Sequence, residues 1–97
     1  MINIEPRHRR MIEEILIRHV PTHEIRAFGS RVTGKAKPYS DLDLVVLGSQ
    51  RLPQPVLYKL RDDFEESDLP FRIDILDWNR LSAEFKHAIL SQSEVLR

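Results

Sequence analysis

Apolar residues recur at intervals of three and four positions in three stretches of the chain, which predicts three amphipathic helices. The first covers residues 6–20, the second covers residues 56–66, and the third begins near Ser82, a residue type suited to an N-cap. Their apolar stripes are Ile12, Ile15, Leu16 and Val20; Leu57, Leu60 and Phe64; and Phe85, Ala88 and Ile89. The acidic residues at 62, 63, 65 and 66 are then expected on the solvated face of the second helix.

Alternation of apolar and polar positions predicts three strands, at residues 24–28, 41–47 and 71–77. In DLDLVVL, the leucines and valine at positions 42, 44 and 46 point to one face, whereas Asp41 and Asp43 point to the other. That second face starts charged and turns apolar, as expected where a buried strand emerges at a cleft. In FRIDILD, Asp74 lies on the face opposite Ile73 and Ile75.

The order helix, strand, strand, helix, strand, helix predicts an α/β fold. We expect a small mixed sheet of about three strands or slightly more, flanked by helices. Residues 31–37 form a turn or short helix that Gly34 interrupts, and residues 48–55 form a loop. A chain of 97 residues, 41% of them hydrophobic, suffices for one modest core, which predicts a single domain over residues 1–97.

Composition narrows the range of functions. The chain has no cysteine, so disulfides and thiolate metal sites are excluded. No apolar run reaches the roughly 18 residues of a membrane helix, and the start MINIEPRHRR lacks a signal core, which predicts a cytoplasmic protein. The net charge is zero, which argues against dedicated DNA binding. We interpret the basic cluster Arg7, Arg9 and Arg10 as the exposed face of a helix.

Asp41 and Asp43 form a candidate metal site. Side chains at positions i and i+2 of a strand point the same way, with Cα atoms roughly 7 Å apart. Carboxylates held in this way suit Mg²⁺, which takes oxygen ligands and bridges protein carboxylates to substrate phosphates. No His or Cys stands beside the pair, which disfavours zinc. If the strands at 41–47 and 71–77 are adjacent, Asp74 joins the pair as a third carboxylate.

A Gly-Ser turn precedes this strand by a short interval. Gly29 lets the backbone approach a phosphate closely, and the following N–H groups are free donors at a helix start. The Ser30 hydroxyl adds a further donor, and Arg31 and Lys35 add positive charge. We therefore expect the turn to hold a triphosphate while Asp41 holds its magnesium together with the second aspartate.

Each of these features alone is weak, but their combination in one order is specific. The run FGSRVTGKAKPYSDLDLVV resembles the signature of the polymerase-β-type nucleotidyltransferases, and nearly the whole chain resembles their minimal branch, the MNT proteins. The resemblance implies the nucleotidyltransferase fold and Mg²⁺-dependent transfer from ATP, with two metal ions during catalysis. The implied phosphate-binding residues are Gly29, Ser30 and Arg31. The implied catalytic and metal-binding residues are Asp41, Asp43 and Asp74, the last often the general base.

The resemblance also implies a partner. Larger relatives carry an added region for the acceptor, whereas this chain ends soon after its last helix, so we expect a partner or a second copy to supply the acceptor. MNT proteins are commonly paired with a helical HEPN protein encoded next door. There they act as antitoxins that transfer AMP to a tyrosine hydroxyl of the toxin. The leading hypothesis is therefore a protein-modifying nucleotidyltransferase.

Other functions compete with this hypothesis. A non-catalytic module could neutralise its partner by occlusion, with Leu52, Leu57, Trp78 or Phe85 as exposed anchors, although Trp78 is better interpreted as a core-edge residue. Transfer to a small molecule ranks lower, because such relatives use extra chain to hold the acceptor. RNA tailing is disfavoured by the even charge and the lack of a basic aromatic surface. Edge strands in so small a sheet allow self-pairing into a homo-oligomer.

Overall fold

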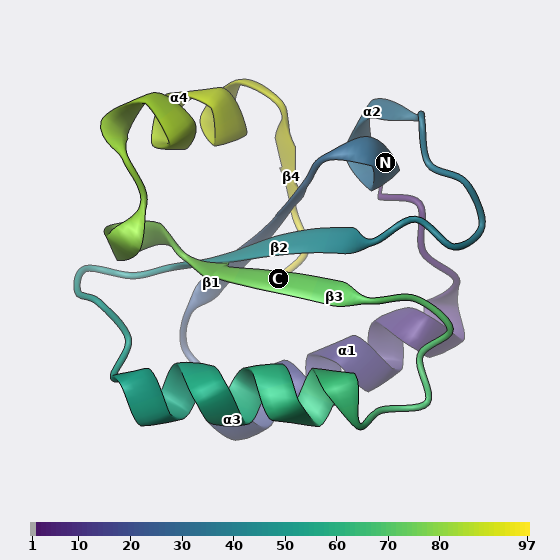
Figure 1. The fold of residues 1–97 in the computed structure, drawn as a ribbon, viewed down its shortest axis with the longest axis horizontal. Coiled ribbons are helices and arrows are strands. Elements are labelled where there is room, and N and C mark those ends of the chain that lie inside the picture. Colours follow the sequence, from purple (N-terminus) through teal and green to yellow (C-terminus); the bar gives the residue numbers. More distant parts are fainter. Residues whose placement is uncertain (1) are drawn as a thin grey trace.

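The computed structural model describes residues 2–97. The helices are α1 (Pro6–His19), α2 (Ser30–Thr33), α3 (Gln54–Glu65) and α4 (Ala83–Ser91), and the strands are β1 (Glu24–Phe28), β2 (Leu42–Leu47), β3 (Ile73–Asp77) and β4 (Ser93–Val95). A 3₁₀ turn, Trp78–Arg80, follows β3. Figure 1 shows α1 and α3 together on one side of the sheet, with α2 and α4 on the other side.

The four strands form one mixed sheet in the order β3-β2-β1-β4. β1 is antiparallel to both of its neighbours, whereas β2 and β3 run parallel. α3 connects the two parallel strands, as such a crossover requires. The predicted α/β class, a small mixed sheet flanked by helices, is confirmed.

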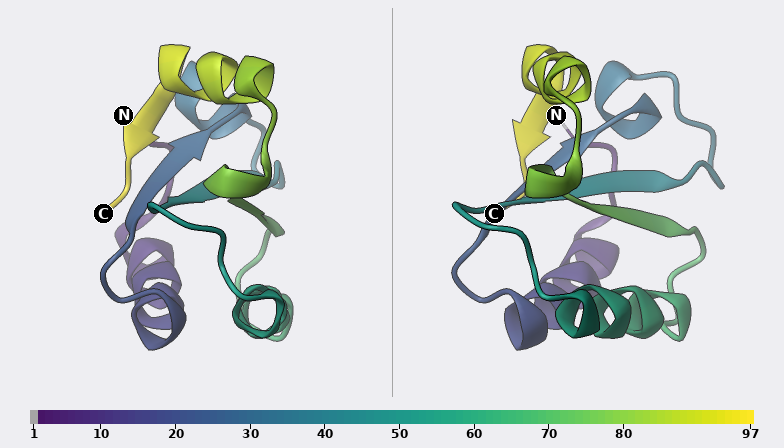
Figure 2. Two further views of the ribbon diagram at one scale, coloured as in Figure 1. Left: turned by 90° about the vertical axis from the view of Figure 1, so that its left-hand side faces the viewer. Right: turned by 60° about the vertical axis from the view of Figure 1, so that its left-hand side comes forward.

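The core lies between the sheet and the pair α1 and α3 (Figure 2). Leu42 and Leu44 are fully buried and Val46 is 1% exposed, which confirms that this face of β2 points inward. The helices contribute Ile12, Ile15, Leu16, Leu57, Leu60 and Phe64 to the same cluster. Burying each such side chain contributes about 1.5–3 kcal/mol. Because a one-residue slip of β2 would invert its two faces, this burial fixes which face carries the aspartates.

Most element boundaries agree with the sequence pattern to within two residues. Ser82 caps α4, because its hydroxyl accepts a hydrogen bond from the amide of Phe85 at 3.1 Å. Gly34 ends α2 in the left-handed conformation with φ +83°, as its predicted role as a breaker requires. β4 was not predicted, since its three residues show no alternation and are defined only by pairing with β1. Leu96, directly after it, is buried and donates to the carbonyl of Ile25 at 2.8 Å.

Two predicted surface assignments were wrong. Leu52 and Leu57, proposed as exposed anchors, are only 5% and 2% exposed and belong to the core. Asp63, expected on the solvated face of α3, is half-buried and lies 2.6 Å from Nε2 of His19 on α1. The hydrogen bond with His19, helped by the charges of His19 and Arg18, lowers the pKa of Asp63. The pair therefore joins α1 to α3.

No helix within residues 2–97 is both long and apolar enough to span a lipid bilayer.

Candidate active site

The strand register brings the aspartates to one edge of the sheet. β2 and β3 are adjacent, which fulfils the condition for a three-carboxylate site. Their register pairs Asp43 with Asp74, so the two side chains point to the same face from neighbouring strands. Asp41 precedes β2 by one residue and is exposed, as is Asp74, whereas Asp43 is half-buried.

The three carboxylates interact electrostatically. Burial, followed by the negative charges of Asp74 and Asp41, raises the pKa of Asp43. The ionised form of Asp43 is therefore disfavoured in the folded protein, and a cation placed among these oxygens would reverse this effect.

The donor set suits magnesium, although the residues do not form a closed metal cage. Within residues 2–97, no three His, Cys, Asp or Glu side chains converge closely enough to hold a metal ion. Mg²⁺ does not need such a cage, since it keeps several waters and uses one or two carboxylates together with substrate phosphates. The all-oxygen donors of Asp41, Asp43 and Asp74 therefore fit Mg²⁺, and their predicted roles as ligands and catalysts stay predictions.

Gly29 brings the Gly-Ser turn against Asp43. Its φ of +78° and ψ of −157° lie in a region that side chains rarely adopt. A Cβ at this position would clash with Oδ2 of Asp43 and lie 3.2 Å from its Cγ. In register, Phe28 stands opposite Asp43 across β1 and β2, so the turn leaves the sheet beside this carboxylate. Glycine is thus required here both by conformation and by close approach.

Ser30 opens α2 with unused donors. Within the part of the chain that the structure describes, neither its amide nor its hydroxyl donates a hydrogen bond to the protein. α2 has only 4 residues, so the expected contribution of a helix dipole is small and the local N–H groups dominate. These free N–H and O–H donors of Ser30 lie beside the half-buried carboxylate of Asp43. They therefore suit an anion that binds together with a cation, such as a phosphate group with Mg²⁺. The nucleotide-binding roles of Gly29 and Ser30 stay predictions.

Arg31 does not extend from the turn into solvent. It is 6% exposed, and its guanidinium donates to the carbonyl oxygens of Asn3, Pro38 and Ser40. Burial lowers the pKa of Arg31, and the nearby charge of Asp41 acts in the opposite direction. Its predicted contact with phosphate stays a prediction, whereas the observed contacts of its guanidinium are with backbone carbonyls.

Ser40 closes a turn that starts at Lys37. Its hydroxyl accepts a hydrogen bond from the amide of Lys37 at 2.8 Å, and its own amide donates to the Lys37 carbonyl at 3.0 Å. Lys35 is exposed. The segment 37–40 is therefore a tight turn that leads the chain directly to Asp41.

An open cavity of about 860 Å³ adjoins two of the three carboxylates, Asp41 and Asp74. It lies beside β3, the C-terminal half of α3 and the loop that joins them. Asp41 and Asp74 line it together with the apolar side chains of Leu69, Phe71 and Ile73. This volume is in the range of pockets that bind small molecules, so the acidic edge opens onto space for a nucleotide or an acceptor group.

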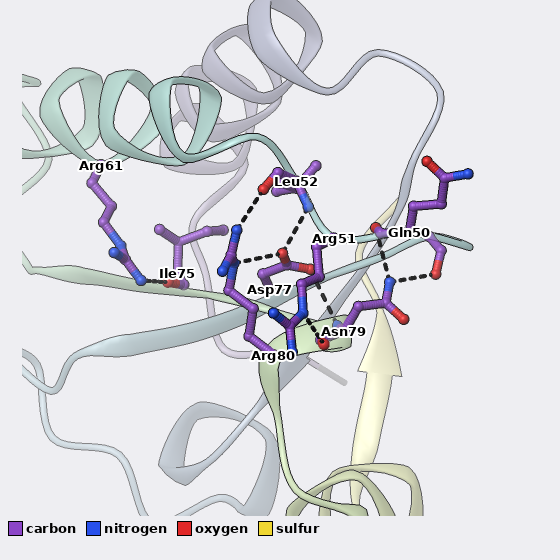
Figure 3. Close-up of polar contacts among 9 residues, drawn as sticks. Gln50, Arg51, Leu52, Arg61, Ile75, Asp77, Asn79 and Arg80 are labelled. Atoms are coloured by element: carbon purple, nitrogen blue, oxygen red, sulfur yellow. Dashed lines mark hydrogen bonds and ion pairs between the residues drawn. The ribbon is translucent and has the colours of Figure 1, made fainter.

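Asp77, which was not among the predicted site residues, fixes the opposite end of the same two strands (Figure 3). It is 3% exposed and accepts hydrogen bonds from the amides of Leu52 and Asn79 and from Nε of Arg80. Arg80 also donates to the carbonyl of Leu52 at 2.8 Å. An aspartate two residues before an asparagine at a strand end is a turn signal, and it could have indicated these hydrogen bonds of Asp77 in advance.

The fold and this arrangement of residues define a nucleotidyltransferase domain. The family model described as polymerase beta, nucleotidyltransferase matches residues 10–97. The chain therefore belongs to the polymerase beta nucleotidyltransferase family, which confirms the predicted enzyme class.

Relatives resemble this chain over most of its length. The chain is 42% identical over 88 residues to the probable protein adenylyltransferase MntA of Haemophilus influenzae, covering 91% of this chain and 77% of that protein. A toxin–antitoxin complex with AMP-PNP matches with a TM-score of 0.76 at 24% identity, covering 92% of this chain and 72% of the other. A complex of tri-AMPylated Shewanella oneidensis HEPN toxin with MNT antitoxin matches with a TM-score of 0.71 at 22% identity. The match covers 97% of this chain and 72% of the other. At these identities the structural matches establish the fold.

Proposed function

We propose that the protein transfers AMP from ATP to a hydroxyl group of a partner protein, and that it serves as the antitoxin of a HEPN-type toxin. The observation that carries the proposal is the meeting of three motif elements on one sheet face. Asp43 is paired in register with Asp74, and Gly29 lies against the Asp43 carboxylate. The 42% identity to a probable protein adenylyltransferase supports the choice of AMP and of a protein acceptor.

The proposed reaction is a displacement at the α-phosphorus of ATP. The acceptor oxygen forms a bond to that phosphorus while the bond to the bridging oxygen of the β-phosphate breaks, and pyrophosphate leaves. Asp74, exposed and beside the cavity, takes the proton of the attacking hydroxyl. The amide and hydroxyl of Ser30 bind phosphate oxygens, and Gly29 leaves them room to approach.

Magnesium would be held by Asp41 and Asp43, with Asp74 available to a second ion, and would supply charge neutralisation at the phosphates. The chain's own contribution is to place these carboxylates beside the turn and the cavity. Protein and nucleotide partners of the structural relatives, a HEPN toxin and AMP-PNP, fit this assignment.

The decisive experiment compares wild type with Asp43→Asn in a transfer assay containing ATP, Mg²⁺ and the HEPN-type protein proposed as its partner. Asp62→Asn, at an exposed aspartate on α3 that does not line the cavity, is the matched control. We expect AMP on the partner with the wild type and the control, and none with Asp43→Asn. Full transfer by Asp43→Asn would overturn the proposal.

A second candidate is neutralisation by occlusion without catalysis. One observation favours it: Phe85, Leu90 and Val95 on α4 and β4 are 42%, 52% and 50% exposed, which leaves apolar surface for a partner. A variant that combines Asp41→Asn with Asp43→Asn separates the two candidates. If this variant still protects cells from the toxin, occlusion is the better account; if protection is lost while the complex still forms, catalysis is.

A further inference from the structure

The guanidinium of Arg31 fastens the segment that carries Asp41. Nε and Nη2 both donate to the carbonyl oxygen of Ser40, at 3.0 and 2.8 Å. That carbonyl belongs to the peptide group joining Ser40 to Asp41, so the paired hydrogen bonds orient the backbone from which the Asp41 side chain projects. Nη2 also donates to the carbonyl of Pro38 at 3.2 Å, which fixes the same turn at a second point.

The same side chain ties this turn to two other segments. Nη1 donates to the carbonyl of Asn3 at 2.9 Å, and the amide of Asn3 donates back to the Arg31 carbonyl at 2.9 Å. The guanidinium carbon lies 4.1 Å from the centre of the Phe71 ring, in a cation–π arrangement. Phe71 is two residues from the start of β3, the strand that carries Asp74. Arg31 thus contacts both the turn that precedes β2 and the segment that precedes β3, the two strands near which the three aspartates lie.

These contacts leave little of the guanidinium for a phosphate. Both hydrogens of Nη2, the hydrogen of Nε and one hydrogen of Nη1 are used in hydrogen bonds to carbonyls. Arginine binds phosphate most strongly through two parallel N–H groups. Such a pair is available only if one of the observed bonds breaks, and the side chain is only 6% exposed.

We propose that Arg31 is a positioning residue, which acts through the 37–40 turn to hold Asp41 in place rather than by binding the nucleotide. A lysine cannot replace it, because an ammonium group lacks the planar fork that engages two carbonyls and stacks on an aromatic ring. We call the contacts of the Arg31 guanidinium with the 37–40 turn, Asn3 and Phe71 the clasp. Arg31→Lys therefore keeps the positive charge and removes the clasp. Its kinetic consequences rest on the function proposed above, whereas its structural consequences do not.

The structural test is hydrogen exchange of the backbone amides, without metal or nucleotide, in Arg31→Lys and in a matched control, Arg80→Lys. Arg80 fastens the loop before α3 at the other end of the same two strands (Figure 3). We expect Arg31→Lys to speed exchange in residues 36–42 at least about tenfold, since local opening sets this rate. Arg80→Lys should instead speed exchange in residues 48–53. Unchanged exchange in residues 36–42 of Arg31→Lys would overturn the proposal.

The kinetic test separates positioning from phosphate binding. For Arg31→Lys we expect kcat to fall on the order of 100-fold, as for a slight misplacement of a catalytic group, with little change in the KM for nucleotide and a higher Mg²⁺ requirement. A normal kcat with a raised KM for nucleotide would assign Arg31 to the phosphates instead. If wild type itself transfers nothing, the proposed function fails, and the exchange result still decides the role of Arg31.

A second variant tests the same contacts in case Arg31→Lys does not fold. Phe71→Leu removes the ring under the guanidinium and keeps every hydrogen bond of Arg31. We expect faster exchange in the same residues 36–42, by less than in Arg31→Lys. Exchange in that segment indistinguishable from wild type would remove the stacking contact from the proposed clasp and contradict the proposal in this form.

Discussion

Asp43→Asn is expected to stabilise the fold while it abolishes catalysis. The substitution keeps the size of the side chain and removes its charge. Since the folded-state pKa of Asp43 is raised, the folded protein holds the proton more tightly than the unfolded chain does. The contribution of Asp43 to stability is therefore most favourable at low pH and falls as the pH rises through the unfolded-state and then the folded-state pKa of this residue. The asparagine variant avoids this loss.

The magnitude follows from the strand geometry. Side chains paired across neighbouring strands lie about 5 Å apart, and two unit charges at that distance repel by about 0.8 kcal/mol in water and about 3 kcal/mol at an effective dielectric constant near 20. Asp74 and Asp41 are exposed, which places the expected gain at the lower end, about 1 kcal/mol. In a domain of this size, that gain raises Tm by about 4–8 °C.

The assay is thermal unfolding in EDTA, without nucleotide, over a range of pH from neutral to acidic. We expect Asp43→Asn to melt above wild type at neutral pH, with the difference shrinking as the pH falls through the raised pKa of Asp43. Asp62→Asn, on the exposed face of α3, should shift stability by no more than about 0.5 kcal/mol. An asparagine variant that is less stable than wild type at neutral pH, or a difference independent of pH, would refute the electrostatic reasoning.

Three further predictions concern other parts of the fold. In denaturant unfolding, Gly29→Ala should lower the free energy of unfolding by more than about 2 kcal/mol, because the new methyl group meets the Asp43 carboxylate and φ is positive. Gly34→Ala should lower it by only about 1 kcal/mol, because φ is also positive but a methyl group there meets no atom within 4 Å. Because the folded-state pKa of Asp63 is lowered, its stabilisation is present at neutral pH and lost as the pH falls through that pKa, so the Tm values of wild type and Asp63→Asn should converge in acid. Asp77→Asn should cost about 1–3 kcal/mol in denaturant unfolding, because it weakens a buried acceptor.

Each of these predictions has a contradicting result. Equal losses for the two glycine variants would show that the contact at Gly29 does not constrain the site. A constant Tm difference for Asp63→Asn down to acidic pH would remove the helix-joining hydrogen bond as its cause. A neutral Asp77→Asn would mean that the loop before α3 is held by other contacts.

Much of the fold could be predicted because it is encoded locally. The 3.6-residue spacing of Ile12, Ile15 and Leu16 and the alternation around Asp43 specify which faces become buried. β4 could not be predicted, since it exists only through pairing with β1. Leu52 was misassigned because nothing in a loop's composition shows that its amide docks on a buried aspartate.

The candidate site shows the same division. From the sequence, the convergence of Asp43 and Asp74 depended on one unknown, namely whether their strands are neighbours in the sheet. The structure shows that β2 and β3 are neighbours, joined by a crossover connection. The role of Arg31 could not be inferred, because an arginine beside a Gly-Ser turn fits either phosphate or protein carbonyls. Only the three-dimensional structure shows that its guanidinium donates to backbone carbonyls, one of which belongs to Asn3, 28 positions away in the sequence.

The most direct test of the central claim is mass spectrometry of the proposed HEPN-type partner after incubation with this protein, Mg²⁺ and each nucleoside triphosphate in turn, beside an Asp74→Ala control. We predict an AMP adduct on a hydroxyl side chain of that partner with ATP, present with wild type and absent with Asp74→Ala. A tight complex of the two proteins that carries no adduct under any nucleotide would contradict the account.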